Sequence, residues 1–97
     1  MKQIERLDGL MEHLKIDYSQ TIAELGDNWG NINVHYGIRI AKDITKVHQK
    51  QTLLHEIIHY CSDFSQIGLE EKQVEALGNS LFAILRANPE LLIIEEE

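Results

Sequence analysis

The residues of this chain most suited to chemistry are His55, Glu56 and His59, which form an H-E-x-x-H arrangement inside an apolar run. Two histidines four apart on a helix stand on one face, about 40° apart around the axis and about 6 Å apart along it. From that face both imidazoles can reach one Zn²⁺, and Glu56 can take a proton from zinc-bound water. The spacing predicts a zinc site on a helix, with Glu56 as its catalytic residue.

The residues around the motif favour a zinc site over a chance occurrence of the H-E-x-x-H sequence. With five His and eleven Glu in 97 residues, roughly 0.03 such motifs are expected by chance. On a helical wheel the motif residues share one arc with Thr52, and the opposite arc is apolar. That apolar arc comprises Leu53, Leu54, Ile57, Ile58, Tyr60, Cys61 and Phe64. The bland alternative, two solvent-facing histidines beside an incidental glutamate, does not account for this division of the helix.

A catalytic zinc site needs a third protein ligand and one open position for water. No histidine follows His59, which excludes a later His as the third ligand. Asp63 and His48 fall on the motif face but too far along the helix to converge on the same ion. His13 and His35 have no spacing argument behind them.

A second helix downstream offers glutamates at 70, 71 and 75. Glu71 and Glu75 lie one turn apart and flank the apolar stripe of that helix, so either can lean into the gap between the helices. Gly78 near the same stripe would let the two backbones approach closely. Spacing alone leaves Glu71 and Glu75 equal candidates.

Composition predicts one small domain spanning residues 1–97. The net charge of −7 argues against nucleic acid and anionic membrane surfaces as partners, because both require clustered Lys and Arg. Neither a signal peptide nor an apolar run long enough to cross a membrane is visible, so a cytoplasmic location is expected. The single cysteine, Cys61, excludes an intrachain disulfide and is expected to be buried and inert.

The elements that must position the motif can be placed by periodicity. Apolar residues at helical spacing favour a helix over residues 1–16, although Asp8-Gly9 is a turn dipeptide that could instead join two strands. Residues 17–25 are consistent with a short strand, and residues 26–31 with a turn-rich loop in which Trp29 folds back onto the core or faces a substrate. Alternation over 32–41 predicts one strand, bent or bulged at Gly37.

Helix signals are clearer in the second half. Asp43 or Thr45 can cap the motif helix, which is predicted to run to about residue 63. The second helix starts near Leu69 and ends at Asn88-Pro89, since proline disfavours helical geometry in the residue before it. Residues 91–94 can add a terminal segment that packs back. The predicted fold class is α+β, a short antiparallel β-sheet packed against two helices that carry the metal ligands.

The run from Gln51 to His59 resembles the core of small gluzincin-type metallopeptidases, the ImmA/IrrE-like proteins and their short relatives from phages and mobile elements. The resemblance continues through residues 68–79 and closes at 85–89, where L-R-A-N-P is similar to the end of the phage versions. It covers roughly residues 30 to 90 and does not extend cleanly to the first thirty. The helix-turn-helix or sensor domain of larger members is not expected within these 97 residues.

In that family the third ligand is a glutamate that opens an E-x-x-A-N-x-(F/L) stretch, and residues 75–81 match it with Gly at position 78. The resemblance therefore implies His55, His59 and Glu75 as zinc ligands, and a strand before the motif helix as the edge of the substrate cleft. It implies a zinc metallopeptidase that acts on a protein or peptide. Tyr36, His35, His48 and Tyr60 are candidates for stabilising the oxyanion.

Two other functions compete with this one. A zinc-binding regulatory or structural module could keep the fold without significant turnover, and the presence of Glu56 counts mildly against it because a structural site needs no general base. An interaction protein could instead use its strand edge to bind a partner without metal. Metal content separates the last class from the first two.

Overall fold

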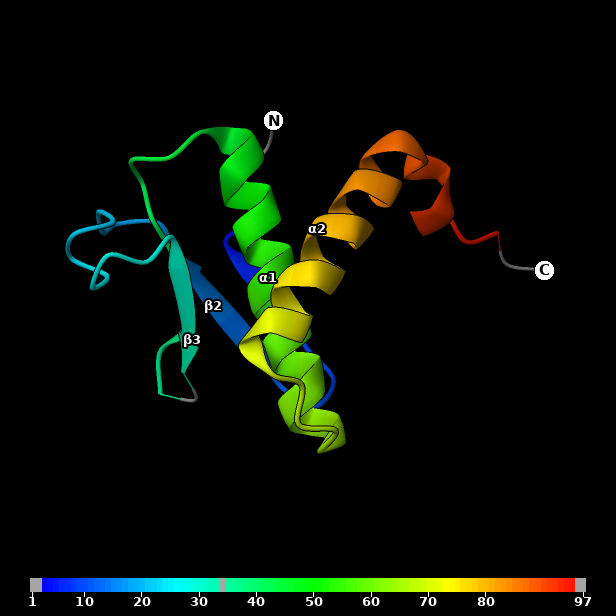
Figure 1. Cartoon of the computed structure of the whole chain (residues 1–97), viewed down its shortest axis with the longest axis horizontal. Helices are drawn as coiled ribbons and strands as arrows, with labels where there is room; N and C mark the ends of the chain where they lie inside the picture. Colours follow the sequence, from blue (N-terminus) through cyan, green and yellow to red (C-terminus); the bar gives the residue numbers. More distant parts are fainter. Residues whose placement is uncertain (1–2, 34, 96–97) are drawn as a thin grey trace.

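Four short strands precede two long helices in a computed structural model that describes residues 3–33 and 35–95 (Figure 1). The elements are β1 (Arg6–Asp8), β2 (His13–Asp17), β3 (Gly30–Asn33), β4 (Gly37–Ile40), α1 (Lys46–Ser65), α2 (Glu71–Ala87) and a short 3₁₀ helix, η1 (Pro89–Leu92). The α+β class predicted from the sequence is confirmed. In space α1 lies between the sheet on one side and α2 on the other, so the motif helix is the central layer.

The N-terminal region forms a hairpin, so the helix favoured for residues 1–16 is wrong. The backbone N–H of Gly9 donates to the carbonyl of Glu12 at 2.7 Å and closes the turn that Asp8-Gly9 allows. Leu14 and Ile16, two residues apart, are buried on one face of β2. Met11, which helical spacing would place with the buried residues, is 81% exposed. The period-2 pattern of β2 therefore prevails over the period-3.6 pattern.

The sheet is mixed, and the expectation of an antiparallel sheet is wrong in this respect. Its strand order is β1-β2-β4-β3; β1 and β3 pair antiparallel with their neighbours, but β2 and β4 run parallel, with Ile16 opposite Ile38. The chain leaves β2, forms the outer strand β3 and returns as β4 beside β2. This places β3 at an edge of the sheet and β4 in its interior.

The single strand predicted over residues 32–41 is instead the β3–β4 hairpin. Val34, one of its alternating residues, lies outside the described residues. Gly37 begins β4 with φ +84°, a conformation in which a side chain is strained, so it ends the turn and does not bend a continuous strand. The strand predicted over residues 17–25 is also wrong: residues 22–26 form turns that bury Leu25.

The core lies between the sheet and α1. Ile38 and Ile40 of β4 are fully buried, and Leu53 reaches them from α1. Thr45 caps α1 as predicted, its Oγ1 accepting the backbone N–H of His48 at 3.1 Å. The buried Gln49 side chain donates to the carbonyl of Ala41 at 3.0 Å. These contacts fix the start of α1 against the end of β4.

The second helix, α2, ends at Ala87 before Asn88-Pro89, as the proline predicts. It packs on α1 through the buried Val74 and Gly78 and contacts none of the four described strands. The expected packing-back of residues 91–94 is limited to contact between η1 and α2, and these four side chains are 60–82% exposed. The C-terminal half of α2 therefore projects from the body of the molecule (Figure 1).

Candidate metal centre

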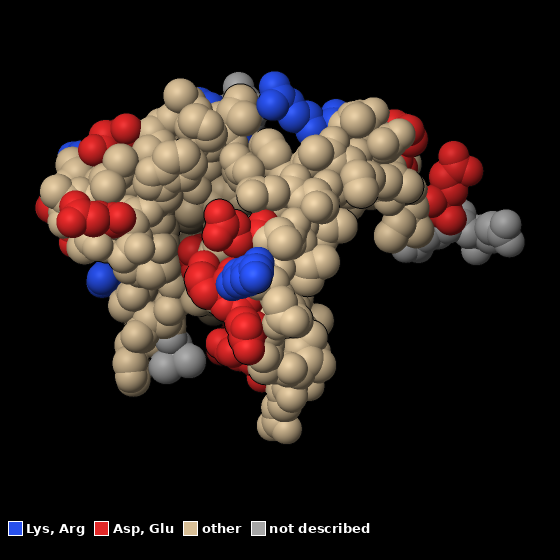
Figure 2. Space-filling view, in the orientation of Figure 1, with Lys and Arg blue, Asp and Glu red and all other residues tan. Residues whose placement is uncertain are grey.

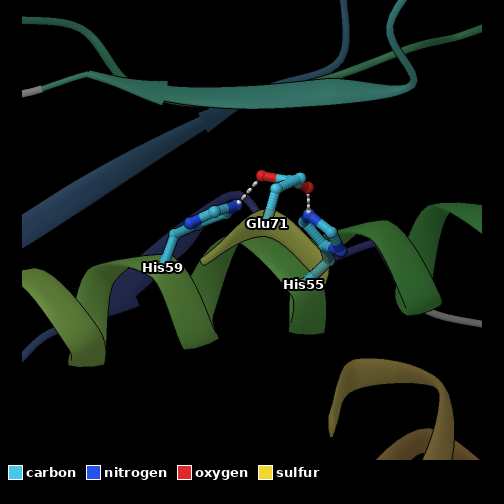
Figure 3. Close-up of side chains that lie close together, drawn as sticks. All are labelled: His55, His59 and Glu71. Carbon is cyan, nitrogen blue, oxygen red and sulfur yellow. Dashed lines mark hydrogen bonds and ion pairs between the residues drawn. The ribbon is translucent and has the colours of Figure 1, made fainter. Parts of the chain in front are cut away.

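The two motif histidines and one glutamate converge between α1 and α2 (Figure 3). Glu71 Oε1 lies 2.7 Å from His55 Nε2, and Glu71 Oε2 lies 2.8 Å from His59 Nε2. One ligand atom from each residue lies within 4.8 Å of the other two. The imidazoles are about three-quarters buried and the carboxylate is reached from solvent. Two nitrogens and one carboxylate oxygen are the donor set of many catalytic zinc sites.

The carboxylate that contacts both imidazoles is Glu71, whereas the family resemblance favours Glu75. Glu71 is the first residue of α2, and the helix crosses α1 there, directly over His55 and His59. Glu75 lines the same cleft one turn later, but no hydrogen bond or ion pair of its side chain occurs among the described residues. The assignment of Glu75 stays a prediction, and Glu71 is the carboxylate that this geometry favours.

Glu56 is the most unusual carboxylate in the chain. It is only 6% exposed, it lines the cleft beside the histidines, and no side chain or backbone N–H of the described residues hydrogen-bonds to it. Burial raises the pKa of Glu56 above its usual range, against a smaller lowering by His55 and His59. A buried carboxylate with a raised pKa and no partner is suited to accept and return a proton.

The cleft has a volume of about 800 Å³ and follows the motif face of α1. Its floor is the row Gln51, Thr52, His55 and His59; β3 and the residues just before it form one wall and α2 the other. Gly30 allows β3 to lie close over α1, since a Cβ there would come within 2.7 Å of Thr52 Cγ2. The hollow is visible between the sheet side and α2 in Figure 2, with acidic side chains around it.

Two aromatic rings in contact with each other line the cleft. Trp29 stacks on His48 with ring centroids 4.7 Å apart and stays 44% exposed, and both line the cleft. Trp29 therefore faces the cleft, the second of the two positions open to it from the sequence. His48 is the one candidate for oxyanion stabilisation that the structure brings into the cleft.

The other residues considered from the sequence lie elsewhere. The Tyr36 hydroxyl donates to Asn31 Oδ1 at 2.9 Å, under the guanidinium of Arg39. The Tyr60 hydroxyl accepts the backbone N–H of Leu10 at 3.0 Å on the sheet side of α1. His13 pairs with Asp8 on the β1–β2 hairpin. None of the three lines the cleft, and His13 does not belong to the group formed by His55, His59 and Glu71.

Sequence reasoning missed the residue that sets the position of Glu71. Ser62 is 2% exposed, and its Oγ accepts the backbone N–H of Leu69 at 2.8 Å. The connection also carries Gln66 at φ +56°, whose N–H bonds to the carbonyl of Asp63. Together they turn the chain sharply from α1 into α2. A serine near the predicted end of a helix is the sequence signal that could have identified this contact.

The expectation that Cys61 is buried is wrong, because Cys61 is exposed. The last turns of α1 extend past the sheet, so the apolar arc predicted for the motif helix is left partly uncovered there; Phe64 is 48% exposed for the same reason. Neither residue lines the cleft.

Comparisons with protein-family models, curated proteins and solved structures found no match to this chain. Within the described residues, neither α1 nor α2 combines the length and the apolar character that crossing a bilayer requires.

Proposed function

We propose that this protein is a zinc metallopeptidase, with His55 and His59 as two ligands, a glutamate of α2 as the third and Glu56 as the general base. The observation that carries the proposal is the convergence of two imidazole nitrogens and a carboxylate within 4.8 Å, beside a buried and unpartnered Glu56. A structural zinc site needs four protein ligands and no base, so this arrangement fits a catalytic site better.

The donor set fits zinc. His55 and His59 offer Nε2 atoms from one helix face, and Glu71 offers carboxylate oxygens from the facing helix. Bound zinc supplies Lewis-acid activation of water and of a scissile carbonyl. The short contacts between carboxylate and imidazoles mean that Glu71 must withdraw slightly when an ion enters, and its exposed position permits that movement.

The protein's own groups then have distinct tasks. The Glu56 carboxylate takes the proton of the attacking water and transfers it to the nitrogen of the leaving amine. Its burial favours the neutral form and so eases proton uptake. His48 lines the same cleft and is the candidate hydrogen-bond donor to the developing oxyanion.

Substrate binding can use the edge of the sheet. An extended peptide can pair as an additional strand with β3, because β3 lies at the edge of the sheet and has one neighbouring strand. β4, which directly precedes the motif helix, has a neighbouring strand on each side and cannot accept a further strand. Residues 30–32 of β3 line the cleft above the histidines. A peptide docked there lies across the three proposed ligands, His55, His59 and Glu71.

Metal stoichiometry is the first test. Purified protein should hold about one zinc per chain, measured by mass spectrometry under native conditions, and His55→Ala should abolish it. The matched pair Glu71→Gln and Glu75→Gln identifies the third ligand: the geometry predicts a loss for Glu71→Gln and retention for Glu75→Gln. Absence of zinc binding by the wild-type protein, even with zinc supplied, would sink the proposal.

Activity is tested separately from binding. Zinc-loaded wild-type protein is incubated with a peptide library, and cleavage is read by mass spectrometry beside Glu56→Gln protein. The expected result is cleavage by the wild type and a loss of at least about 100-fold in Glu56→Gln, with zinc content retained. If both proteins bind zinc and neither cleaves any peptide or protein offered, the zinc-binding module without turnover is the better account.

A further inference from the structure

The C-terminal half of α2 carries an apolar face that no other part of the described chain covers. Leu77, Leu81 and Ile84 are 39–50% exposed and fall within about 60° of one another around the helix. Residues 91–94, in the second half of η1 and directly after it, are four further apolar residues, 60–82% exposed. Helix faces of this kind are normally buried against a partner.

The size of this surface matches one side of a stable interface. The exposed parts of these seven residues sum to roughly 700 Å², close to the ~800 Å² that each partner buries in a standard protein–protein interface. Exposed apolar residues elsewhere in the described chain, such as Met11 and Ile4, are scattered and form no comparable stripe. The stripe therefore needs an occupant of about its own size.

The distribution of charged residues favours a second copy of this chain as the partner of this apolar face. Each chain carries a net charge of −7, which disfavours contact between two copies over most of the surface. The ten residues from 76 to 85 contain no charged side chain at all. Figure 2 shows one group of acidic side chains around the cleft and others at the left edge and near the C-terminal end, with an uncharged length of α2 between the cleft and the C-terminal end. Here two copies can meet without opposing like charges.

The spacing of the exposed apolar residues on α2 also favours a second copy of this chain as the partner. Positions 77, 81 and 84 follow the alternating four- and three-residue steps of a coiled-coil seam. If two such helices pack antiparallel about a two-fold axis near Leu81, Leu77 of each lies opposite Ile84 of the other. The seam is then complementary to itself, as a two-fold interface requires.

We infer that this protein forms a two-fold symmetric homodimer in which the two α2 helices pack antiparallel through Leu77, Leu81 and Ile84. Glu75, which lines the cleft, lies about 120° from Leu81 around the helix axis. The cleft therefore stays open in the dimer, and dimer formation and zinc binding are independent properties.

Sedimentation velocity over a wide concentration range tests the dimer. The wild-type protein should reach twice the mass of the 11.2 kDa chain, and Leu81→Glu should raise the dissociation constant by roughly tenfold or more. Met11→Glu, an equally drastic change at an exposed apolar residue outside the face, should leave it unchanged. Circular dichroism and zinc content confirm that Leu81→Glu stays folded. A wild-type protein that is monomeric throughout, or a Leu81→Glu protein that dimerises like wild type, overturns the inference.

Disulfide trapping tests the direction of packing in a Cys61→Ser background. A mixture of Leu77→Cys and Ile84→Cys proteins should form mixed disulfides, because an antiparallel seam brings these positions together. Leu77→Cys alone should cross-link poorly, since its two copies lie about 10 Å apart along the axis. Efficient self-linking of Leu77→Cys without mixed disulfides would contradict the antiparallel arrangement.

Discussion

The Gln51 side-chain amide donates to Asn79 Oδ1 at 2.7 Å, and this bond joins α1 to α2 one helical turn before His55. Both residues line the cleft, and Gly78 beside Asn79 faces the backbone of His55. The histidines belong to one helix and the glutamates to the other. The relative position of the helices therefore decides whether the ligands meet.

Removing this bond should loosen the helix pair. Asn79→Ala and Gln51→Ala are each expected to lower the free energy of unfolding by about 0.5–1 kcal/mol, since the bond is partly open to solvent. In a double-mutant cycle by urea denaturation, the double variant should lose less than the two single losses combined. Strict additivity would show that the two side chains do not interact.

Ser62→Ala should weaken the site without touching a ligand. Loss of the hydroxyl leaves the partly buried N–H of Leu69 without its acceptor and loosens the turn that leads to Glu71. We expect about 1–2 kcal/mol lower stability and weaker zinc affinity in a competition titration. Ser80→Ala, at an exposed position of α2, is the control and should change neither. Unaltered zinc affinity in a destabilised Ser62→Ala protein would limit Ser62 to a role in folding.

Two glycines with left-handed backbone conformations allow the cost of backbone strain to be measured separately from the cost of a steric contact. Gly37 has φ +84° and its added Cβ would collide with the backbone of Lys15, whereas Gly68 has φ +64° and open space around it. Gly68→Ala should cost about 1 kcal/mol of conformational strain, and Gly37→Ala at least about 2 kcal/mol more, because β2 and β4 must also separate. Urea denaturation measures both. Equal costs would mean that the pairing of β2 with β4 is looser than described.

The burial of Glu56 predicts that the free energy of unfolding depends on pH when a chelator keeps the protein free of metal. Burial raises the folded-state pKa of Glu56 above its unfolded value, so the folded state binds this proton more tightly. Its contribution to stability is full below the unfolded pKa and is lost as the pH rises through the folded pKa. Glu56→Gln should therefore be more stable than wild type at neutral pH, and the difference should shrink toward acidic pH. Urea denaturation with chelator at both pH values measures this, and a difference that does not change with pH would contradict it.

The parts of the fold specified by neighbouring residues were predictable from the sequence. The H-E-x-x-H run, the Thr45 cap and the Asn88-Pro89 stop all act within a turn or two, and α1 and α2 begin and end close to where these signals place them. The α+β class follows from the same local patterns.

The predictions fail where contacts between residues far apart in the sequence determine the structure. Residues 1–16 fit a helical and a strand pattern alike, and only burial of Leu14 and Ile16 against the later strand β4 selects the strand. The parallel pairing of β2 with β4 has no local signature. Glu71 and Glu75 lie one turn apart on the same side of α2, and the choice between them depends on how Ser62 and Gln66 turn the chain.

Trp29 is the only tryptophan of the chain, and it packs on His48 in the lining of the cleft. All indole emission of the protein therefore comes from one half-exposed ring that lines the cleft. A peptide that enters the cleft must displace water from that ring or change its stacking. The molecule thus carries a built-in optical reporter of cleft occupancy, which needs neither a label nor turnover.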